Sequence, residues 1–332
     1  MCKKAELHEH GSDPTVTIPL PTFADVLAAA ERIQPFIHRT PVLTSQALNN
    51  MFGAQLYFKC ENLQKIGAFK ARGACNAVFM LDDETAQHGV VTHSSGNHGQ
   101  ALAYAARLRG IPCTIVMPNN APAVKQDAVV EYGATVVLCE PTLSARLSTM
   151  QDIMHRTGAH PIPPYDDALV IAGQGTAALE LIEDYPDLDI VMAPVGGGGL
   201  LSGTAIAANG RDPSITVIGA EPAIADDAKR SLETGIRQPP PSTLTVADGL
   251  RTSLGEITFS VLQYLNVHIV TASEDAIIEG VYRMMERLKI VVEPSASVTL
   301  GAIIEDPLLV AGKKVGIIVC GGNLDVRNYL RV

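Results

Sequence analysis

The chain has 332 residues, of which 47% are hydrophobic and 18% are charged, and its formal net charge is −10. This length is more than one hydrophobic core usually serves, so we expect two domains, and the apolar content excludes a disordered chain. The acidic balance argues against nucleic acid as a partner, and the lack of any apolar run near ~18 residues argues against a membrane protein.

Local patterns predict the first elements of the chain. Residues 1–14 contain lysines with no apolar run behind them, which argues against a secretory signal and indicates a short disordered tail. Thr22 and Asp25 resemble a capping box, which predicts a helix whose apolar face runs through residues 26–33. Apolar and polar side chains alternate over residues 56–60, as in a strand.

Short β-branched runs then alternate with helical stretches. Strands are expected at 90–93, 114–117, 135–139, 190–194, 216–220 and 315–320, and helices at 71–81, 97–109, 123–132, 143–156 and 201–208. Gly110 and Gly133 stand where left-handed C-caps are expected. Repeated strand–helix units predict an α/β fold with mostly parallel sheets, in which ligands bind beyond the carboxyl ends of the strands.

A glycine run, Gly196 to Gly199, separates a predicted strand from a predicted helix. Glycine lets the backbone approach an anion, and the helix N-terminus offers free N–H groups, so the run predicts phosphate binding. A plain tight turn is the alternative, although so many glycines cost much chain entropy. The dinucleotide pattern fails because Leu201 replaces its third glycine, and the phosphate-loop pattern fails because Thr204 replaces its lysine.

Lys70 stands at the expected start of the apolar helix 71–81. Most lysines are solvated surface residues, but a helix N-terminus disfavours a cation. A desolvated lysine at this position would have a lowered pKa and would be a competent amine nucleophile.

Two further polar segments each allow two interpretations. Residues 93–100 read HSSGNHGQ, which fits either an N-capping turn or a carboxylate site made of backbone N–H and hydroxyl groups. Residues 220–227 hold several carboxylates, which form either a solvated loop or the ligands of a hard cation.

The six cysteines are scattered and form no C-x-x-C pair. This spacing indicates free thiols in a reducing compartment rather than a disulfide framework or a zinc site. We therefore expect a cytoplasmic protein.

Together these segments resemble the fold-type II pyridoxal-phosphate enzymes, in the branch of the serine/threonine dehydratases and serine racemases. The string around residues 94–100 looks most like the eukaryotic serine racemases. We expect the glycines in the strings, such as Gly173 and Gly175, to mark close approach of the backbone to a ligand. The matching strings span about residues 37–323 in the family's order: IHRTPVLTS, FKCENLQKIGAFKARGA, VVTHSSGNHGQALAYAA, IPPYDDALVIAGQGT, VGGGGLLSG, GAEPAIADD, VADGLRTSLG, VVEPSA and CGGN.

The resemblance implies a tryptophan synthase β-like fold, with the cofactor between two domains built on parallel sheets. The large cofactor-binding domain would comprise residues 1–84 and 165–332. Residues 85–164 would form an inserted small mobile domain, which closes over the substrate.

The resemblance also implies which residues hold the cofactor, pyridoxal 5′-phosphate. Lys70 would bind it covalently, Phe69 would lie against its ring and Asn97 would bond its 3′ oxygen. Cys320 occupies the position that faces the pyridine nitrogen. The phosphate would be held by the glycine run, that is by Gly196, Gly197, Gly198 and Gly199.

The substrate and a divalent cation have implied sites as well. The substrate would contact Ser94, Ser95, Asn97, His98 and Arg146. The cation, Mg²⁺ or another such as Mn²⁺ or Ca²⁺, would be bound by Glu221, the carbonyl of Ala225 and Asp227.

The implied activity is that of an amino-acid racemase and ammonia-lyase. Lys70 would remove the Cα proton of a small hydroxy-amino acid. Loss of the β-hydroxyl would then lead to a 2-oxo acid and ammonia, whereas a proton from the opposite face would give the other enantiomer. Ser95 matches the serine that supplies this proton in the racemases, which favours a serine racemase with serine/threonine dehydratase activity. The alternative is an L-threo-3-hydroxyaspartate or L-threonine dehydratase with little racemase activity.

The chain departs from the family pattern at three places. Ala68 replaces a serine of the animal racemases. Cys320 replaces the usual serine, and a thiol is a weaker hydrogen-bond donor that, if ionised, would favour a protonated ring. Residues 163–167 lack the serine cluster of the aspartate-racemising relatives, which argues against an aspartate racemase.

Assembly and other functions are left open at this stage. Relatives imply a homodimer. Lys65, Gln100 and Tyr132 match residues that line a nucleotide site at the dimer interface of animal racemases, which leaves ATP open as an activator. An oxidoreductase on a dinucleotide fold and a non-catalytic small-molecule sensor are the other candidate functions.

Overall fold

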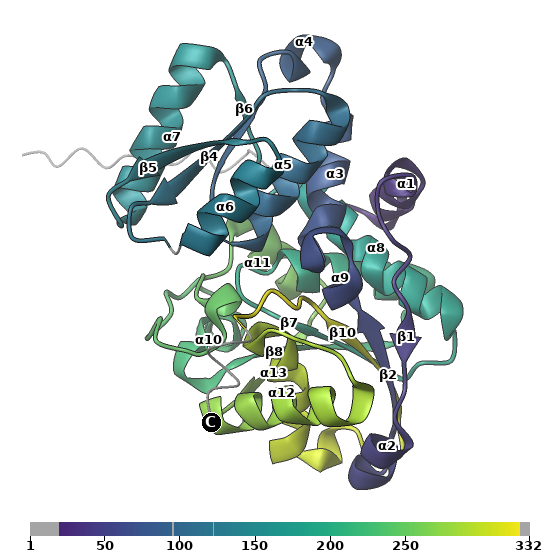
Figure 1. Cartoon of the computed structure of the whole chain (residues 1–332). Coiled ribbons are helices and arrows are strands. Elements are labelled where there is room, and N and C mark those ends of the chain that lie inside the picture. The colour runs from purple at the N-terminus through teal and green to yellow at the C-terminus, as the bar shows by residue number, and fades with distance from the viewer. Residues whose placement is uncertain (1–19, 95, 122, 326–332) are drawn as a thin grey trace, which may run out of the picture.

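The computed structural model describes residues 20–94, 96–121 and 123–325, so the expected N-terminal tail and Ser95 lie outside the described residues. The described chain forms two sheets with helices packed on them (Figure 1). The six-stranded sheet, here the large sheet, has the spatial order β1 (Val42–Leu43), β2 (Gln55–Cys60), β10 (Lys314–Val319), β7 (Ile190–Pro194), β8 (Thr216–Pro222) and β9 (His268–Ala272). The four-stranded small sheet has the order β5 (Thr135–Cys139), β4 (Cys113–Pro118), β3 (Val90–His93) and β6 (His160–Pro161).

All strand pairs are parallel except β1 with β2, as the strand–helix pattern predicts. The helices that join and cover the strands are α1 (Phe23–Ile33), α2 (Gln46–Phe52), α3 (Lys70–Met80), α4 (Asp83–Ala86), α5 (Asn97–Arg109), α6 (Ala123–Glu131), α7 (Leu143–Thr157), α8 (Ala168–Asp184), α9 (Gly199–Arg211), α10 (Asp227–Thr234), α11 (Glu256–Tyr264), α12 (Glu274–Leu288) and α13 (Pro294–Glu305).

The helix ends follow the predicted chemistry. The expected capping box opens α1, since the Thr22 hydroxyl accepts from the Asp25 N–H and the Asp25 carboxylate accepts from the Thr22 N–H at 2.7 Å. Gly110 ends α5 with a φ of 73°, and Gly133 follows α6 with a φ of 90°. Both conformations lie in the left-handed region, which favours glycine at a helix C-terminus.

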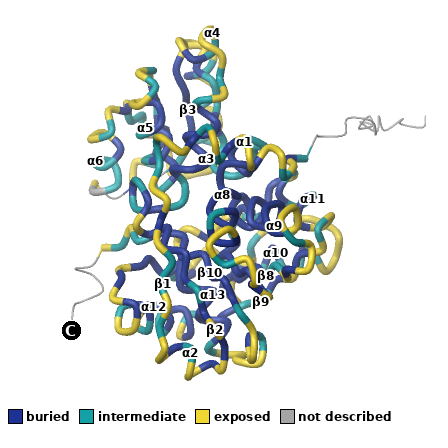
Figure 2. The backbone as a smooth tube through the Cα atoms, turned by 90° about the vertical axis from the view of Figure 1, so that its right-hand side faces the viewer, coloured by how far each residue is buried: buried dark blue, intermediate teal, exposed yellow. Residues whose placement is uncertain are grey.

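The large sheet is buried because helices cover both of its faces. Every residue of β7 is buried. Successive residues of a strand point to opposite faces. On β8, Gly219 faces Leu201 of α9, whereas Ala220 packs in the same apolar cluster as Val298 of α13. Figure 2 shows the resulting buried strands between exposed helix surfaces and loops.

The helix α3 lies between the two sheets (Figure 1). Its buried residues, among them Ala71, Ala74 and Val78, share one apolar cluster with Leu102 of α5 and Ile115 of β4. The small sheet is built from residues 90–161, and the large sheet from segments before and after it. The apolar cluster around α3 continues into the small sheet, so it marks no boundary between two domains. The domain limits 85–164 therefore stay a prediction.

Two glycines serve helix packing rather than ligand binding. A Cβ at Gly173 of α8 would lie 2.6 Å from the Cα of Gly73 on α3, and one at Gly175 would lie 2.7 Å from the carbonyl oxygen of Gly203 on α9. The expectation that Gly173 and Gly175 mark a ligand was therefore wrong. They let α8 cross its two neighbours closely, which brings α3 against the large domain's helices.

The described cysteines, Cys60, Cys75, Cys113, Cys139 and Cys320, are all free thiols, as predicted. Within the described ranges, no helix combines the length and apolar character needed to cross a membrane.

Candidate active site

The carboxyl ends of β2, β10 and β7 lie at one edge of the large sheet, because β10 pairs in parallel with both neighbours. Beyond this edge, the Phe69 N–H donates to the Cys320 carbonyl at 3.0 Å, and Ala68 forms an isolated bridge with Gly321. This pairing holds the start of α3 against the CGGN segment. As a result, Lys70 and Cys320 lie close to each other although they are far apart in the sequence.

Lys70 is the first residue of α3, as its sequence context predicted. Its Nζ donates to the Pro164 carbonyl at 2.5 Å and lies 5.1 Å from the centroid of the Phe69 ring. Burial lowers the pKa of Lys70 to about 8, against the opposing effect of Cys320 and Glu293. A lysine with this pKa is partly neutral near neutral pH and can act as a nucleophile or a base.

Asn97 joins the two sides of the site. It is the first residue of α5, beyond the small sheet, and its Nδ2 lies 3.1 Å from both carboxylate oxygens of Glu293. Its Oδ1 accepts from the Nδ2 of Asn323 at 2.8 Å, and the same Nδ2 donates to the Ile66 carbonyl at 2.8 Å. The amide of Asn97 is thus held at both ends by side chains that follow the large sheet.

The glycine run forms a turn between β7 and α9 whose N–H groups are available. Within the described residues, the backbone N–H groups of Gly196, Gly197 and Gly198 donate to no protein group. The Gly197 carbonyl, in contrast, accepts from the Thr258 hydroxyl at 2.8 Å. The turn is therefore anchored through its carbonyl and leaves its donors for an anion.

Close packing adds a second reason for glycine in this run. A Cβ at Gly197 would lie 2.3 Å from the ring of Tyr165, and one at Gly198 would lie 2.7 Å from Thr258. Gly198 also has a φ of 91°, which other residues rarely adopt. The free N–H groups and the neighbouring buried amine of Lys70 fit the phosphate and aldehyde of pyridoxal phosphate.

Cys320 is buried beside Lys70 and Glu293. Burial and the charge of Glu293 raise the pKa of its thiol well above the ordinary value, although Lys70 opposes this. The raised pKa favours the neutral thiol over the ionised form considered from the sequence. A neutral thiol is a weak donor and a weak acceptor toward a ring nitrogen.

The predicted substrate residues Ser94, His98 and Arg146 come from elements on the small-sheet side: Ser94 follows β3, His98 is on α5 and Arg146 is on α7. The Ser94 hydroxyl accepts from the Gly96 N–H at 3.3 Å, in a local turn. His98 Nε2 lies 2.9 Å from the Ile162 carbonyl, and burial lowers the pKa of this ring to about 3. The ring is therefore neutral, with its proton on Nε2, and Nδ1 is an acceptor. A substrate carboxylate would thus have to meet the backbone N–H of His98 rather than its ring.

Several buried polar atoms on this side have no hydrogen-bond partner among the described residues. They are Nδ1 of His93, Nδ1 of His98 and Nε of Arg146. Burial lowers the pKa of His93, and Arg146 lowers it further. Buried polar atoms are usually paired, so a ligand that supplies partners is expected here.

The acidic segment after β8 forms a partly satisfied carboxylate pair. Glu221 accepts from the backbone N–H groups of Ala228 and Lys229 at 3.1 and 2.8 Å. Burial raises the pKa of Glu221 to about 8 and that of Asp227 to about 7. The Oδ2 of Asp227 is buried without a partner in the described chain. Among all the residues that the structure describes, no group of three or more His, Cys, Asp or Glu side chains could hold a metal ion. A hard cation would therefore need the Ala225 carbonyl and water besides these two carboxylates.

The residues matched to a nucleotide site lie on separate elements. Lys65 precedes α3, Gln100 is on α5 and Tyr132 follows α6, with its ring 5.9 Å from that of Tyr104. Within the described ranges, no side-chain hydrogen bond or ion pair joins these three residues, although the turn Lys65–Gly67 packs against α5.

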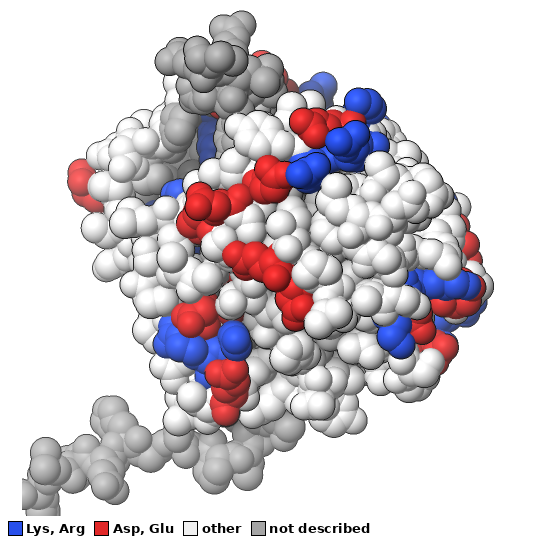
Figure 3. Space-filling model, turned by 90° about the horizontal axis from the view of Figure 1, so that it is seen from below, with Lys and Arg blue, Asp and Glu red and all other residues white. Residues whose placement is uncertain are grey.

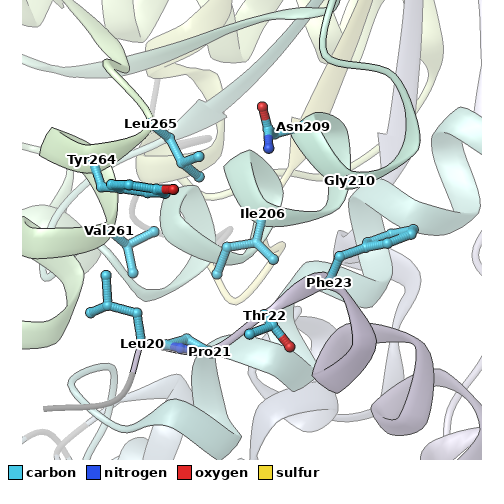
Figure 4. A pocket seen from close by; sticks show the side chains of 10 residues that line it. All are labelled: Leu20, Pro21, Thr22, Phe23, Ile206, Asn209, Gly210, Val261, Tyr264 and Leu265. Atoms are coloured by element: carbon cyan, nitrogen blue, oxygen red, sulfur yellow. The ribbon is translucent and has the colours of Figure 1, made fainter.

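Two surface features lie apart from this site. A mainly apolar pocket of about 340 Å³ is lined by the start of α1 and by parts of α9 and α11, including Ile206 and Tyr264 (Figure 4). None of the predicted site residues lines it. On the face shown in Figure 3, acidic side chains form a strip, and most basic side chains lie beside acidic ones.

Sequence reasoning missed Glu293, Asn323, Thr258 and Tyr165. Glu293 and Asn323 lie within the matched strings VVEPSA and CGGN, so the strings located them without giving them a role. Thr258 is more than fifty positions from the glycine run that it anchors, and no local pattern signals that contact.

The chain is similar to known pyridoxal-phosphate enzymes. The family model described as "Pyridoxal-phosphate dependent enzyme" matches residues 33–321. The chain is 50% identical to a beta-hydroxyaspartate dehydratase of Paracoccus denitrificans, over 92% of this chain and 98% of that protein. It is 47% identical to a serine racemase of Dictyostelium discoideum, over 96% of this chain and 99% of that protein. The solved structure of maize serine racemase superimposes with a TM-score of 0.91 at 43% identity, covering 94% of this chain and 96% of that one.

Proposed function

The chain belongs to the family of pyridoxal-phosphate dependent enzymes, and we propose that it is a serine racemase with serine/threonine dehydratase activity. It would interconvert L- and D-serine and also convert L-serine to pyruvate and ammonia. The observation that carries the proposal is the similarity, at 47% identity over 96% of the chain, to a serine racemase. The buried amine of Lys70, with a pKa of about 8, supports it because both reactions begin with removal of a Cα proton.

Residues of the large-sheet side would hold the cofactor. Lys70 would bind it covalently beside the Phe69 ring. The free N–H groups of the glycine run would hold its phosphate, the Nδ2 of Asn97 would donate to its 3′ oxygen, and Cys320 would face its ring nitrogen. When bound, pyridoxal phosphate supplies the electron sink that makes the Cα proton of an amino acid acidic.

Lys70 would act as the base after the amine of the substrate has replaced it on the cofactor and set its Nζ free. Its Nζ, kept partly neutral by burial, would take the Cα proton of the bound amino acid and become an ammonium. In dehydration, that ammonium would return the proton to the β-hydroxyl, which leaves as water. Hydrolysis of the remaining fragment then gives the 2-oxo acid and ammonia, so that water is released once and consumed once.

Racemisation needs a proton donor on the face opposite Lys70. We assign this role to Ser95, whose hydroxyl would give its proton to Cα and later regain one from solvent or from the reverse reaction. Ser94, Asn97 and His98 would hold the substrate carboxylate, and Arg146 would orient the substrate. The support for these roles is the resemblance of the string HSSGNHGQ to the racemases.

The remaining features of the proposal concern cation, regulation and assembly. Mg²⁺ or a similar cation would bind Glu221, the Ala225 carbonyl and Asp227, where the unpartnered Oδ2 of Asp227 supports a ligand. ATP would act as an activator of a cytoplasmic homodimer. ATP is supported only by the resemblance, because Lys65, Gln100 and Tyr132 match residues that line the nucleotide site of animal racemases.

The test measures both products from one enzyme sample. Purified protein loaded with pyridoxal phosphate is incubated with L-serine, L-threonine and L-threo-3-hydroxyaspartate, with and without Mg²⁺ and ATP. We expect D-serine and pyruvate from L-serine. A protein that binds no cofactor, or that forms 2-oxo acid but no D-amino acid, contradicts the racemase proposal.

A second candidate is a hydroxyaspartate dehydratase with little racemase activity. The 50% identity to a beta-hydroxyaspartate dehydratase favours it. So do the buried, unpartnered atoms of His93 and Arg146, because a substrate with a second carboxylate would supply acceptors there. The ratio of kcat/KM for L-threo-3-hydroxyaspartate to that for L-serine decides between the two.

A further inference from the structure

Glu293 is a buried carboxylate at the site that none of the roles above uses. The residue is 5% exposed and stands at the N-cap position of α13. An N-cap carboxylate ordinarily accepts a hydrogen bond from the first turn of its own helix. The side chain of Glu293 makes no such bond. Its carboxylate therefore does not serve the helix that it begins.

The carboxylate is directed instead to two asparagines. Both oxygens lie 3.1 Å from the Nδ2 of Asn97, and Oε2 accepts from the Asn323 N–H at 3.3 Å. Asn97 begins α5 on the small-sheet side, whereas Glu293 and Asn323 follow elements of the large sheet. The contacts thus connect the two sides of the site through one amide group.

These contacts determine which end of the Asn97 amide points where. Both oxygens of Glu293 face the same amide group. The ionised carboxylate only accepts hydrogen bonds, so this form requires the NH₂ end of the amide. The Nδ2 of Asn323 donates at 2.8 Å, so it requires the oxygen end. With both ends specified, the amide of Asn97 has one orientation, and one proton shared between the two oxygens of Glu293 would leave the second proton of the NH₂ group for a ligand.

The surroundings of Glu293 make a purely structural role costly. No Lys or Arg forms an ion pair with it in the described chain, and a buried unpaired charge is strongly unfavourable. A Cβ at Gly321 would lie 2.9 Å from the carboxylate, so the CGGN segment is shaped around it. Burial is the main cause that raises the pKa of Glu293 to about 7, and the hydrogen bond from Asn97 opposes it. The charge of Asp248 raises this pKa further, whereas the hydrogen bond from the Asn323 N–H and the charge of Lys125 lower it. Lys70 and Cys320 are the other titratable groups within its electrostatic reach.

We propose that Glu293 is a positioning residue, which orients the side-chain amide of Asn97 toward the 3′ oxygen of bound pyridoxal phosphate. The inference rests on the proposed function in one respect, that the chain binds pyridoxal phosphate. It assumes no particular substrate. Glu293 itself would touch neither the substrate nor the reacting atoms, and would act through Asn97.

The test compares Glu293→Gln with the matched control Glu305→Gln. Glu305 is an exposed carboxylate at the other end of α13 that accepts from the Ser273 N–H. The visible absorbance of the bound cofactor is recorded against pH, and the dissociation constant of pyridoxal phosphate is measured by titrating the cofactor-free proteins. We expect Glu293→Gln to weaken cofactor binding about tenfold and to move the midpoint of the absorbance change by about one pH unit. We expect kcat to fall about tenfold with KM nearly unchanged, and Glu305→Gln to match the wild type.

A second pair of proteins shows whether the effect passes through Asn97. In an Asn97→Ala background, Glu293→Gln is expected to change cofactor affinity less than about twofold, because the group it positions is gone. An equal loss in both backgrounds, or wild-type spectra and affinity in Glu293→Gln, would overturn the proposal. If Glu293→Gln does not fold, Glu293→Asp keeps the acceptor one methylene shorter, and an unchanged absorbance midpoint in that variant overturns the proposal as well. A protein that binds the cofactor but converts no hydroxy-amino acid would refute the proposed function and leave these readouts intact.

Discussion

The large-sheet side and the small-sheet side of the site differ in how their buried polar atoms are paired. On the large-sheet side, Glu293 and Asn323 together hold the amide of Asn97, and the carbonyl of the glycine run has a hydroxyl donor. On the small-sheet side, ring atoms of His93 and His98 and the Nε of Arg146 are buried without partners among the described residues.

The difference indicates two kinds of binding. A satisfied network holds its members in one arrangement, which suits a resident cofactor. A buried polar atom without a partner costs roughly 1–3 kcal/mol, so it is tolerated where a ligand supplies the partner, as the cofactor phosphate would for the N–H groups of the glycine run and a substrate would on the small-sheet side. We therefore interpret the large-sheet side as the cofactor cradle and the small-sheet side as the place where substrates are distinguished.

The largest effect is expected where the two sides meet. Lys70→Ala removes the amine that binds the cofactor and takes the Cα proton, so activity should fall by about 10³-fold or more, and the yellow colour of the protein should be lost. Lys313→Ala, at an exposed lysine, is the control and should stay yellow and active. A coloured, active Lys70→Ala protein would contradict the assignment of both roles.

Ser95→Ala tests the proposed proton donor through the ratio of the two products. Loss of the proposed proton donor should lower D-serine formation about 10²- to 10⁴-fold, while some elimination of L-serine remains. Both products are measured in the same reaction by chiral chromatography and a 2-oxo acid assay. Undiminished D-serine formation would refute the role of Ser95.

Arg146→Gln tests whether the unpartnered atoms select a second carboxylate. Loss of a charged hydrogen bond should lower kcat/KM for L-threo-3-hydroxyaspartate by about 10- to 100-fold, and that for L-serine by much less. Arg156→Gln, at an exposed position on the same helix, should change neither value. Equal losses for both substrates would show that Arg146 does not distinguish them.

The pH dependence of the reaction tests the electrostatics of Lys70. A base must be neutral to take a proton, and burial lowers the pKa of Lys70 to about 8. The neutral fraction therefore grows about tenfold as the pH rises from about 7 to about 9, and kcat should follow it and then level off. A kcat that falls over this range would mean that Lys70 acts in its protonated form.

The smallest effect is expected at the acidic segment that follows β8. Mg²⁺ at about a hundred times its dissociation constant should raise Tm by about 4 °C, because it binds only the folded chain. Glu221→Gln should abolish this rise, whereas Glu233→Gln, at an exposed position on α10, should preserve it. A rise of equal size in Glu221→Gln would place the cation elsewhere.

Much of the fold could be predicted because it follows local rules. The strands at 90–93, 135–139 and 190–194 and the helix at 97–109 coincide with β3, β5, β7 and α5. Periodic apolar positions and C-cap glycines are properties of short segments, so the sequence shows them directly. Gly173 and Gly175 could not be interpreted correctly in this way, because their neighbours belong to other helices.

The site was predictable in its parts but not in its connections. The context of Lys70 indicated a desolvated amine, and its burial lowers its pKa as expected. The role of Glu293 required knowledge that its carboxylate turns away from α13 toward Asn97, almost two hundred positions away in the chain.

The sequence alone determined the α/β class, the strand–helix order and the segments that carry the chemistry, since these depend on neighbours within a few positions. Only the tertiary structure decided that Cys320 favours the neutral thiol, that the His98 ring is a neutral acceptor, and that the amide of Asn97 has one orientation. The reason is physical. Burial and hydrogen-bond partners set the protonation and orientation of a polar group, and both come from parts of the chain that meet only in the folded protein.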